Sequence, residues 1–91
     1  MKANSFSFSQ VVRSYELTPA TSQKSFYGKA NVYIMQDGTT FLRSYATIVA
    51  GIDKDGNIHR YWGGWSATTG KHIASFCGMN KKAFTALPLE D

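Results

Sequence analysis

Two Asp-Gly pairs, Asp37-Gly38 and Asp55-Gly56, lie between segments that are rich in β-branched and aromatic residues. Asp-Gly favours the tight turn of a β-hairpin, because glycine adopts positive φ angles without a steric penalty. Apolar and β-branched residues on both sides of such a turn are typical of antiparallel strands. The two pairs therefore predict an antiparallel sheet in the middle of the chain, within a single domain over residues 1–91.

The strands that flank these turns can be bounded from the apolar pattern. We expect four of them, with a bend or bulge at Tyr45-Ala46, over residues 30–36, 39–44, 47–52 and 58–62. Before the strands, apolar side chains recur at helical spacing over residues 6–15, which predicts a short N-terminal helix. Its apolar residues are Phe8, Val11, Val12 and Tyr15.

The C-terminal third of the chain predicts one or two helices. Residues 68–77 form the main one, with Gly78 as its stop and an apolar face of Thr69, Ile73, Phe76 and Cys77. A second short helix over residues 80–87 would be capped by Asn80. The fold class that follows is α+β: an antiparallel three- to four-stranded meander, with a short N-terminal helix and the C-terminal helices on one face.

The charges of the chain are unevenly distributed. The net charge is +4, and no acidic residue lies between Gly56 and Leu89. That stretch holds four cations, Arg60, Lys71, Lys81 and Lys82. Such a basic half suits a polyanion or an acidic protein surface. The alternative is an ordinary solvated face that keeps the protein in solution.

Cysteine usage and hydropathy predict where the protein works. Cys77 is the single cysteine, so no intramolecular disulfide is expected. The N-terminal residues lack the apolar stretch of a signal peptide, and no apolar run has the length of a membrane span. We therefore expect a cytoplasmic protein with no membrane partner.

The start of the helix expected at 68–77 has the composition of an anion site. Hydroxyl and ammonium groups gather there, on Ser66, Thr68, Thr69 and Lys71. The first turn of a helix presents unpaired backbone N–H groups and attracts anions. A nucleotide-binding P-loop is excluded, because Trp65 occupies the position of its first glycine and His72 that of its Ser or Thr. The alternative is simple capping of the helix by Ser66 or Thr68.

Patterns for catalysis or metal binding are missing from the sequence. There are no paired carboxylates and no Cys-x-x-Cys or His-x-x-x-His spacing, and the Asp53-x-Asp-Gly segment lacks the remaining ligands of a calcium loop. We expect no enzyme activity, no cofactor and no metal. Binding would instead use a basic and aromatic surface made of Arg60, Trp65, Lys81 and Lys82.

Two segments carry a resemblance to a known group of proteins. Residues 44–50 read Ser-Tyr-Ala-Thr-Ile-Val-Ala, and residues 65–76 read Trp-Ser-Ala-Thr-Thr-Gly-Lys-His-Ile-Ala-Ser-Phe. They resemble an uncharacterised family of small phage and mobile-element proteins, with a Ser-Tyr-x-Thr-x-Val-Ala segment and an aromatic-Ser-x-Thr-Thr-x-Lys/Arg-His-Ile-x-x-Phe helix. The resemblance covers about the central half of the chain and implies a genomic setting.

In that setting the leading hypothesis is an accessory protein that inhibits a host defence complex, in the manner of an anti-CRISPR protein, by binding without catalysis. Its partner would be a host protein or a protein–nucleic acid complex, and a homodimer is also compatible with the sequence. The alternative is a nucleic-acid-binding module that uses the helix start at residues 68–71. The order helix, strands, helix is that of double-stranded RNA-binding domains, as a fold-level analogy.

Overall fold

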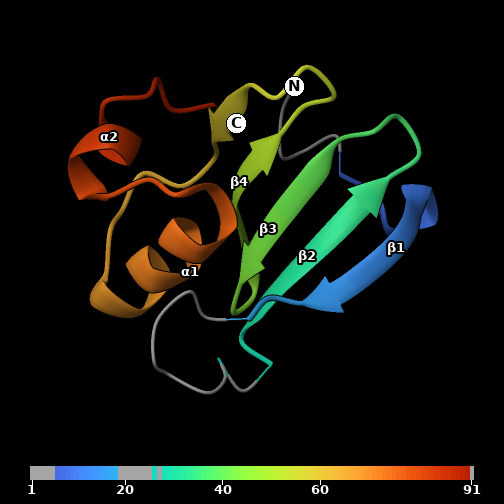
Figure 1. The fold of residues 1–91 in the computed structure, drawn as a ribbon, viewed down its shortest axis with the longest axis horizontal. Coiled ribbons are helices and arrows are strands. Elements are labelled where there is room, and N and C mark those ends of the chain that lie inside the picture. Colours follow the sequence, from blue (N-terminus) through green and yellow to red (C-terminus); the bar gives the residue numbers. More distant parts are fainter. Residues whose placement is uncertain (1–5, 19–25, 27, 91) are drawn as a thin grey trace.

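The computed structural model describes residues 6–18, 26 and 28–90, which form a five-stranded sheet and two C-terminal helices (Figure 1). In chain order the elements are the 3-10 helix η2 (Phe8–Gln10), β1 (Val11–Glu16), β2 (Ala30–Met35), β3 (Thr40–Ser44), β4 (Thr47–Ile52), β5 (Ile58–Arg60), α1 (Ala67–Cys77) and α2 (Lys81–Thr85). The strands lie in the order β1-β2-β3-β4-β5, and each neighbouring pair is antiparallel. The α+β class and the antiparallel meander are therefore as predicted.

The N-terminal helix predicted over residues 6–15 is wrong. The chain makes one 3-10 turn there and continues as β1, an edge strand that pairs with β2. The helical spacing of the apolar residues competes with β-branched Val11 and Val12, which fit a strand well, and with the open edge of β2. The sheet consequently has five strands, not three or four, and the analogy with double-stranded RNA-binding domains loses its first helix.

The hairpin turns follow the sequence. Gly38 and Gly56 have φ angles of 91° and 88°, the left-handed region that glycine favours. The β3–β4 connection, where a bend or bulge is expected, is a turn in which Tyr45 has a φ of 56°. Asp37 Oδ1 accepts a hydrogen bond from the Thr39 amide at 2.9 Å, and that bond lowers the pKa of Asp37.

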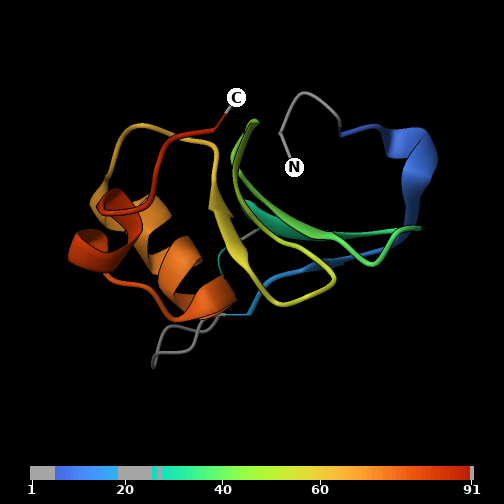
Figure 2. The same ribbon diagram turned by 90° about the horizontal axis from the view of Figure 1, so that it is seen from above.

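The sheet is curved, and its two faces are covered by different parts of the chain (Figure 2). The helices pack on one face, called here the helix face. The main core lies between the helices and the sheet. It consists of Leu17, Phe26, Ala30, Val32, Leu42, Val49, Ala50, Ile73 and Phe84. On the opposite face Phe6 and Val11 cover a smaller cluster of Tyr33, Met35 and Phe41. Residues 19–25 and 27, which come before β2 in the sequence, lie outside the described residues.

Both C-terminal helices begin and end close to the predicted positions. The Ser66 side chain caps α1, Gly78 ends it in the left-handed conformation with a φ of 76°, and the Asn80 side chain caps α2. Ile73 is buried and Phe76 and Cys77 are half-buried, so the predicted apolar face of α1 points to the sheet. Neither helix combines the length and the apolar character that a membrane crossing requires, among the residues that the structure describes.

Candidate functional site

The four residues of the expected anion site divide into two pairs. Ser66 Oγ accepts the Thr69 amide at 3.1 Å, which makes it the helix cap. The Thr69 hydroxyl turns inward and lies 2.9 Å from Ser44 Oγ. Thr68 and Lys71 are exposed at the surface of the helix. Two of the four side chains are thus engaged within the fold, and two face solvent.

Arg60, expected on the basic and aromatic surface, lies half-buried against the C-terminal segment. Its guanidinium donates to the backbone carbonyls of Trp62 at 3.1 Å, Gly63 at 3.2 Å and Leu87 at 3.1 Å. The same group lies 5.6 Å from the centroid of the Phe84 ring. A guanidinium has five N–H donors and can bind several carbonyls at once. Arg60 therefore links the segment before α1 and the segment after α2 to the end of β5.

The Trp65 ring packs against Gly70 of the helix that follows it. A Cβ atom added at Gly70 would come within 2.5 Å of the Trp65 ring, and the ring centroid lies 5.9 Å from that of Phe84. Gly70, at the end of the first turn of α1, therefore leaves the space in which the indole packs. The glycine that resembles part of a phosphate loop in the sequence serves side-chain packing in the structure.

Replacing Gly70 with alanine is expected to destabilise the domain, although alanine favours a helix by about 1 kcal/mol. The new methyl group would displace the Trp65 ring, and overpacking of this kind typically costs about 1–3 kcal/mol. Urea denaturation measures the effect, with exposed Lys71→Ala as the control. In a Trp65→Leu background the same change should cost less, and an equal cost in both backgrounds would contradict the explanation.

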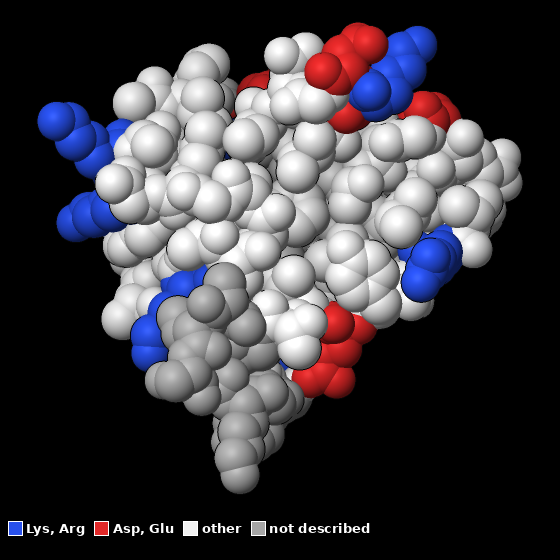
Figure 3. All heavy atoms as spheres, in the orientation of Figure 1, with Lys and Arg blue, Asp and Glu red and all other residues white. Residues whose placement is uncertain are grey.

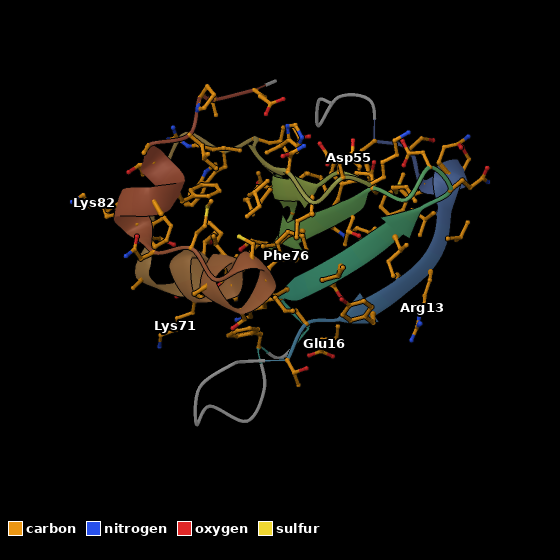
Figure 4. The ribbon with its side chains drawn as sticks, turned by 45° about the horizontal axis from the view of Figure 1, so that its top comes forward. Arg13, Glu16, Asp55, Lys71, Phe76 and Lys82 are labelled. Atoms are coloured by element: carbon orange, nitrogen blue, oxygen red, sulfur yellow. The ribbon has the colours of Figure 1, made fainter. Side chains whose placement is uncertain are left out.

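The three lysines that were expected to bind anions are all exposed on the helices. Lys71 lies on α1, and Lys81 and Lys82 lie on the first turn of α2. Figure 4 shows Lys71 and Lys82 pointing away from the sheet. They form a loose basic side of the helical layer.

A buried polar network, which the sequence reasoning missed, joins the sheet to α1. Ser44 Oγ lies 2.9 Å from Thr69 Oγ1 and 2.8 Å from His72 Nδ1, and all three side chains are buried. Burial lowers the pKa of His72, so the ring is neutral and its Nδ1 can accept a hydrogen bond from Ser44. The edge of the His72 ring contacts Phe26 at a centroid distance of 4.4 Å. In the sequence, His72 and Ile73 follow Thr69 by three and four residues, a spacing that places all three on one face of a helix. This spacing could have indicated that His72 is buried with Ile73.

Although a serine beside a histidine resembles a nucleophile and its base, this pair is enclosed. Ser44 is 3% exposed and His72 is 1% exposed. A substrate would have to displace α1 to reach the hydroxyl. The network therefore stabilises the packing of α1 on β3 through buried hydrogen bonds.

A second polar cluster surrounds His59 on β5. Its Nε2 lies 2.8 Å from Asp53 Oδ2 and its Nδ1 lies 2.7 Å from Glu90 Oε2. Asp53 Oδ1 also accepts the backbone amides of Asp55 and Asn57, both at 2.9 Å. The His59 hydrogen bond, followed by these amides, lowers the pKa of Asp53 to about 2. Because the two carboxylates bind opposite sides of one ring, they do not converge on a common ion, and the described residues hold no group of three or more side chains that suits a metal.

The helix face of the sheet carries an apolar surface beyond the helices. The strand registers place five residues side by side across the sheet: Arg13, Ile34, Thr40, Ile52 and Ile58. The last four are half-buried, and they are called here the isoleucine row. In the next row the three central residues, Val32, Leu42 and Ala50, are fully buried in the core. The isoleucine row thus continues the core outward to solvent.

The charges near the isoleucine row lie on its rim. Figure 3 shows this face, whose centre over β2 and β3 is uncharged while Lys, Arg, Asp and Glu side chains lie towards its outline. At the ends of β2 and β4 the turns line an open hollow of about 310 Å³ with Asp37, Thr39, Asp53, Lys54 and Asp55. An apolar centre with a polar rim is the usual anatomy of a protein interface.

Residues 14–86 match the model of a family of unknown function, DUF8033. No curated protein and no solved structure matches the chain.

Proposed function

We propose that this chain, which belongs to the DUF8033 family of unknown function, is a non-catalytic binding protein that contacts a partner protein through the isoleucine row. The observation that carries the proposal is the half-buried, mainly apolar row itself, which crosses four strands on a face whose centre is uncharged. The phage or mobile-element setting implied by residues 44–50 and 65–76 makes a host defence complex the proposed partner, and its inhibition the proposed outcome.

Charge complementarity suggests what the partner surface is like. Three acidic side chains, Asp37, Asp53 and Asp55, lie in the turns beside the isoleucine row, with Lys54 among them. A partner with an apolar patch and basic residues around it would match this arrangement. Such a partner need not be a nucleic acid, whose phosphates these carboxylates would repel.

Support for binding without catalysis comes from the reactive side chains. His72 and Ser44 are buried together, and His59 is held between two carboxylates. The Cys77 thiol donates to the Ile73 carbonyl at 3.3 Å, and burial raises its pKa, which disfavours the thiolate nucleophile. Each of these groups has a role within the fold.

The proposal is tested by recovering a partner from a host lysate and asking whether substitutions in the isoleucine row abolish that recovery. Ile34→Arg and Thr40→Arg each place a cation in the isoleucine row, and we expect either to cost about 2 kcal/mol of binding, roughly thirtyfold in affinity. Ala83→Arg, at an exposed position of α2, adds the same side chain elsewhere and should bind as the wild type does. Thermal unfolding of each variant separates lost binding from lost folding.

A partner that binds the Thr40→Arg and wild-type proteins equally well would contradict this surface. A separate outcome would contradict the anti-defence role: expression of the gene weakens none of a panel of host defence systems.

A nucleic-acid-binding module is the second candidate, favoured by the exposed position of Lys71, Lys81 and Lys82 on the helical layer (Figure 4). Recovery of the partner would then be lost after nuclease treatment. Binding to duplex and single-stranded probes should fall with salt, and Lys71→Ala should lower the salt slope by about one unit. Undetectable binding at low salt would exclude this candidate.

A further inference from the structure

The C-terminal segment lies along the outer edge of β5 as a short additional strand. Leu89 forms a parallel bridge with Arg60, and the Glu90 amide donates to the Arg60 carbonyl at 2.8 Å. The Glu90 side chain reaches His59 in the same strand. Leu87 packs against the core and its carbonyl accepts from Arg60, whereas Leu89 is 57% exposed, so little apolar burial holds the residues after Leu87 in place.

The two short contacts of His59 require a particular protonation state. A neutral imidazole has one N–H group and one lone pair, whereas the imidazolium ring has two N–H groups. Both ring nitrogens of His59 face carboxylate oxygens, at 2.8 and 2.7 Å. Because a lone pair facing a carboxylate is repelled, the observed arrangement with charged carboxylates belongs to the doubly protonated ring.

We propose that residues 88–90 act as a pH-dependent latch on β5, closed while His59 carries both ring protons and opened when it loses one. The Glu90 contact is the one that opens. Asp53 lies in the turn that leads into β5 and is fixed by two backbone amides, so it keeps the remaining N–H of His59. Opening would expose the β5 edge, including the Arg60 carbonyl, to a strand of another molecule.

The groups around His59 set the direction of the pH dependence. Its pKa is raised, first by the hydrogen bond to Asp53 and then by Glu90, against the opposing effect of burial. The Tyr61 ring stacks on it at a centroid distance of 6.3 Å, and burial raises the pKa of that phenol, which stays neutral. Across the sheet, β4 presents Gly51, which carries no charge.

A raised histidine pKa gives a contribution to stability that is complete below the ordinary value of 6.5. That contribution is lost as the pH rises through the raised value. Asp53 makes a separate contribution, which is complete above its ordinary pKa of 3.8 and is lost as the pH falls towards about 2. The latch is therefore closed in mildly acidic solution and opens on the alkaline side of the His59 titration.

Amide hydrogen exchange followed by NMR on the full chain between pH 5 and pH 9 tests the latch. After correction for the intrinsic rates, we expect protection of the Glu90 amide to fall at least tenfold with the same midpoint as the His59 ring signals. The Tyr61 amide, which donates to the Val49 carbonyl inside the sheet, is the internal reference and should keep its protection. Constant protection of Glu90 across the His59 titration would overturn the proposal.

Two variants separate the latch from a general effect of charge. The amide of Glu90→Gln can accept from or donate to Nδ1, so this variant should lower the His59 pKa and remove the pH dependence of Glu90 exchange. Asp55→Asn removes one negative charge from the same turn without touching a His59 contact and should titrate as the wild type does. Equal His59 titrations in the wild type and Glu90→Gln would also refute the latch.

Discussion

Replacing Phe84 with alanine is expected to remove about 3–5 kcal/mol from the free energy of unfolding, a large part of the total for a domain of this size. Phe84 is fully buried, and its ring contacts both the Trp65 ring and the Arg60 guanidinium. It lies on α2, which has five residues and is too short to be stable by itself. Phe84 is the buried residue of α2, so the apolar docking of this helix depends mainly on its side chain.

Urea denaturation of the variant measures the effect, and exposed Phe8 supplies a matched control. Phe8→Ala makes the same chemical change at a residue that is 65% exposed. It should cost less than about 1 kcal/mol, the scale of its contacts with the Phe6 and Tyr33 rings. Similar losses from both variants would mean that burial of Phe84 does not hold α2 to the sheet.

Ser44→Ala is the second change with a large expected effect. It leaves two buried groups, the Thr69 hydroxyl and His72 Nδ1, without the oxygen that both contact. A buried polar group without a partner costs about 1–3 kcal/mol. The free energy of unfolding should therefore fall several times more than it does for Ser→Ala at an exposed position. Ser14→Ala, on the exposed edge strand β1, is the control and should change stability by less than about 0.5 kcal/mol.

A small loss for Ser44→Ala, equal to that of Ser14→Ala, would show that the network does not fasten α1 to the sheet. The histidine in the network also has a pH signature. Burial lowers the pKa of His72 in the folded protein. Below the ordinary value of 6.5 the unfolded chain therefore binds a proton at this residue that the folded chain does not bind. His72 thus favours the fold at higher pH, opposite in sign to His59.

The residues that carry the family resemblance meet in the structure. Ser44 comes from the segment 44–50, and Thr69 and His72 come from the segment 65–76. Gly70, in the same segment, leaves the space for Trp65. In this chain the residues of the resemblance hold the helix on the sheet, while the isoleucine row that we propose for binding lies outside both segments.

The sequence by itself determined the parts of the fold that are local. Asp-Gly turns, the Ser66 and Asn80 caps and the left-handed Gly78 depend on a few neighbouring residues, and all occur where the sequence places them. The alternating pattern of β2 and the apolar face of α1 depend on a single element. Local chemistry was therefore enough for the α+β class and the antiparallel sheet.

Only the tertiary structure decided what depends on distant residues. Residues 11–16 became a strand because β2 offered a free edge, which outweighed their helical spacing. Thr69 and Arg60, which suggested anion binding, turned inward because Ser44 and the carbonyls after β5 lie within hydrogen-bond reach. The His59–Glu90 contact joins residues 31 apart in the chain. Such pairings depend on how the strands align, which no local pattern encodes.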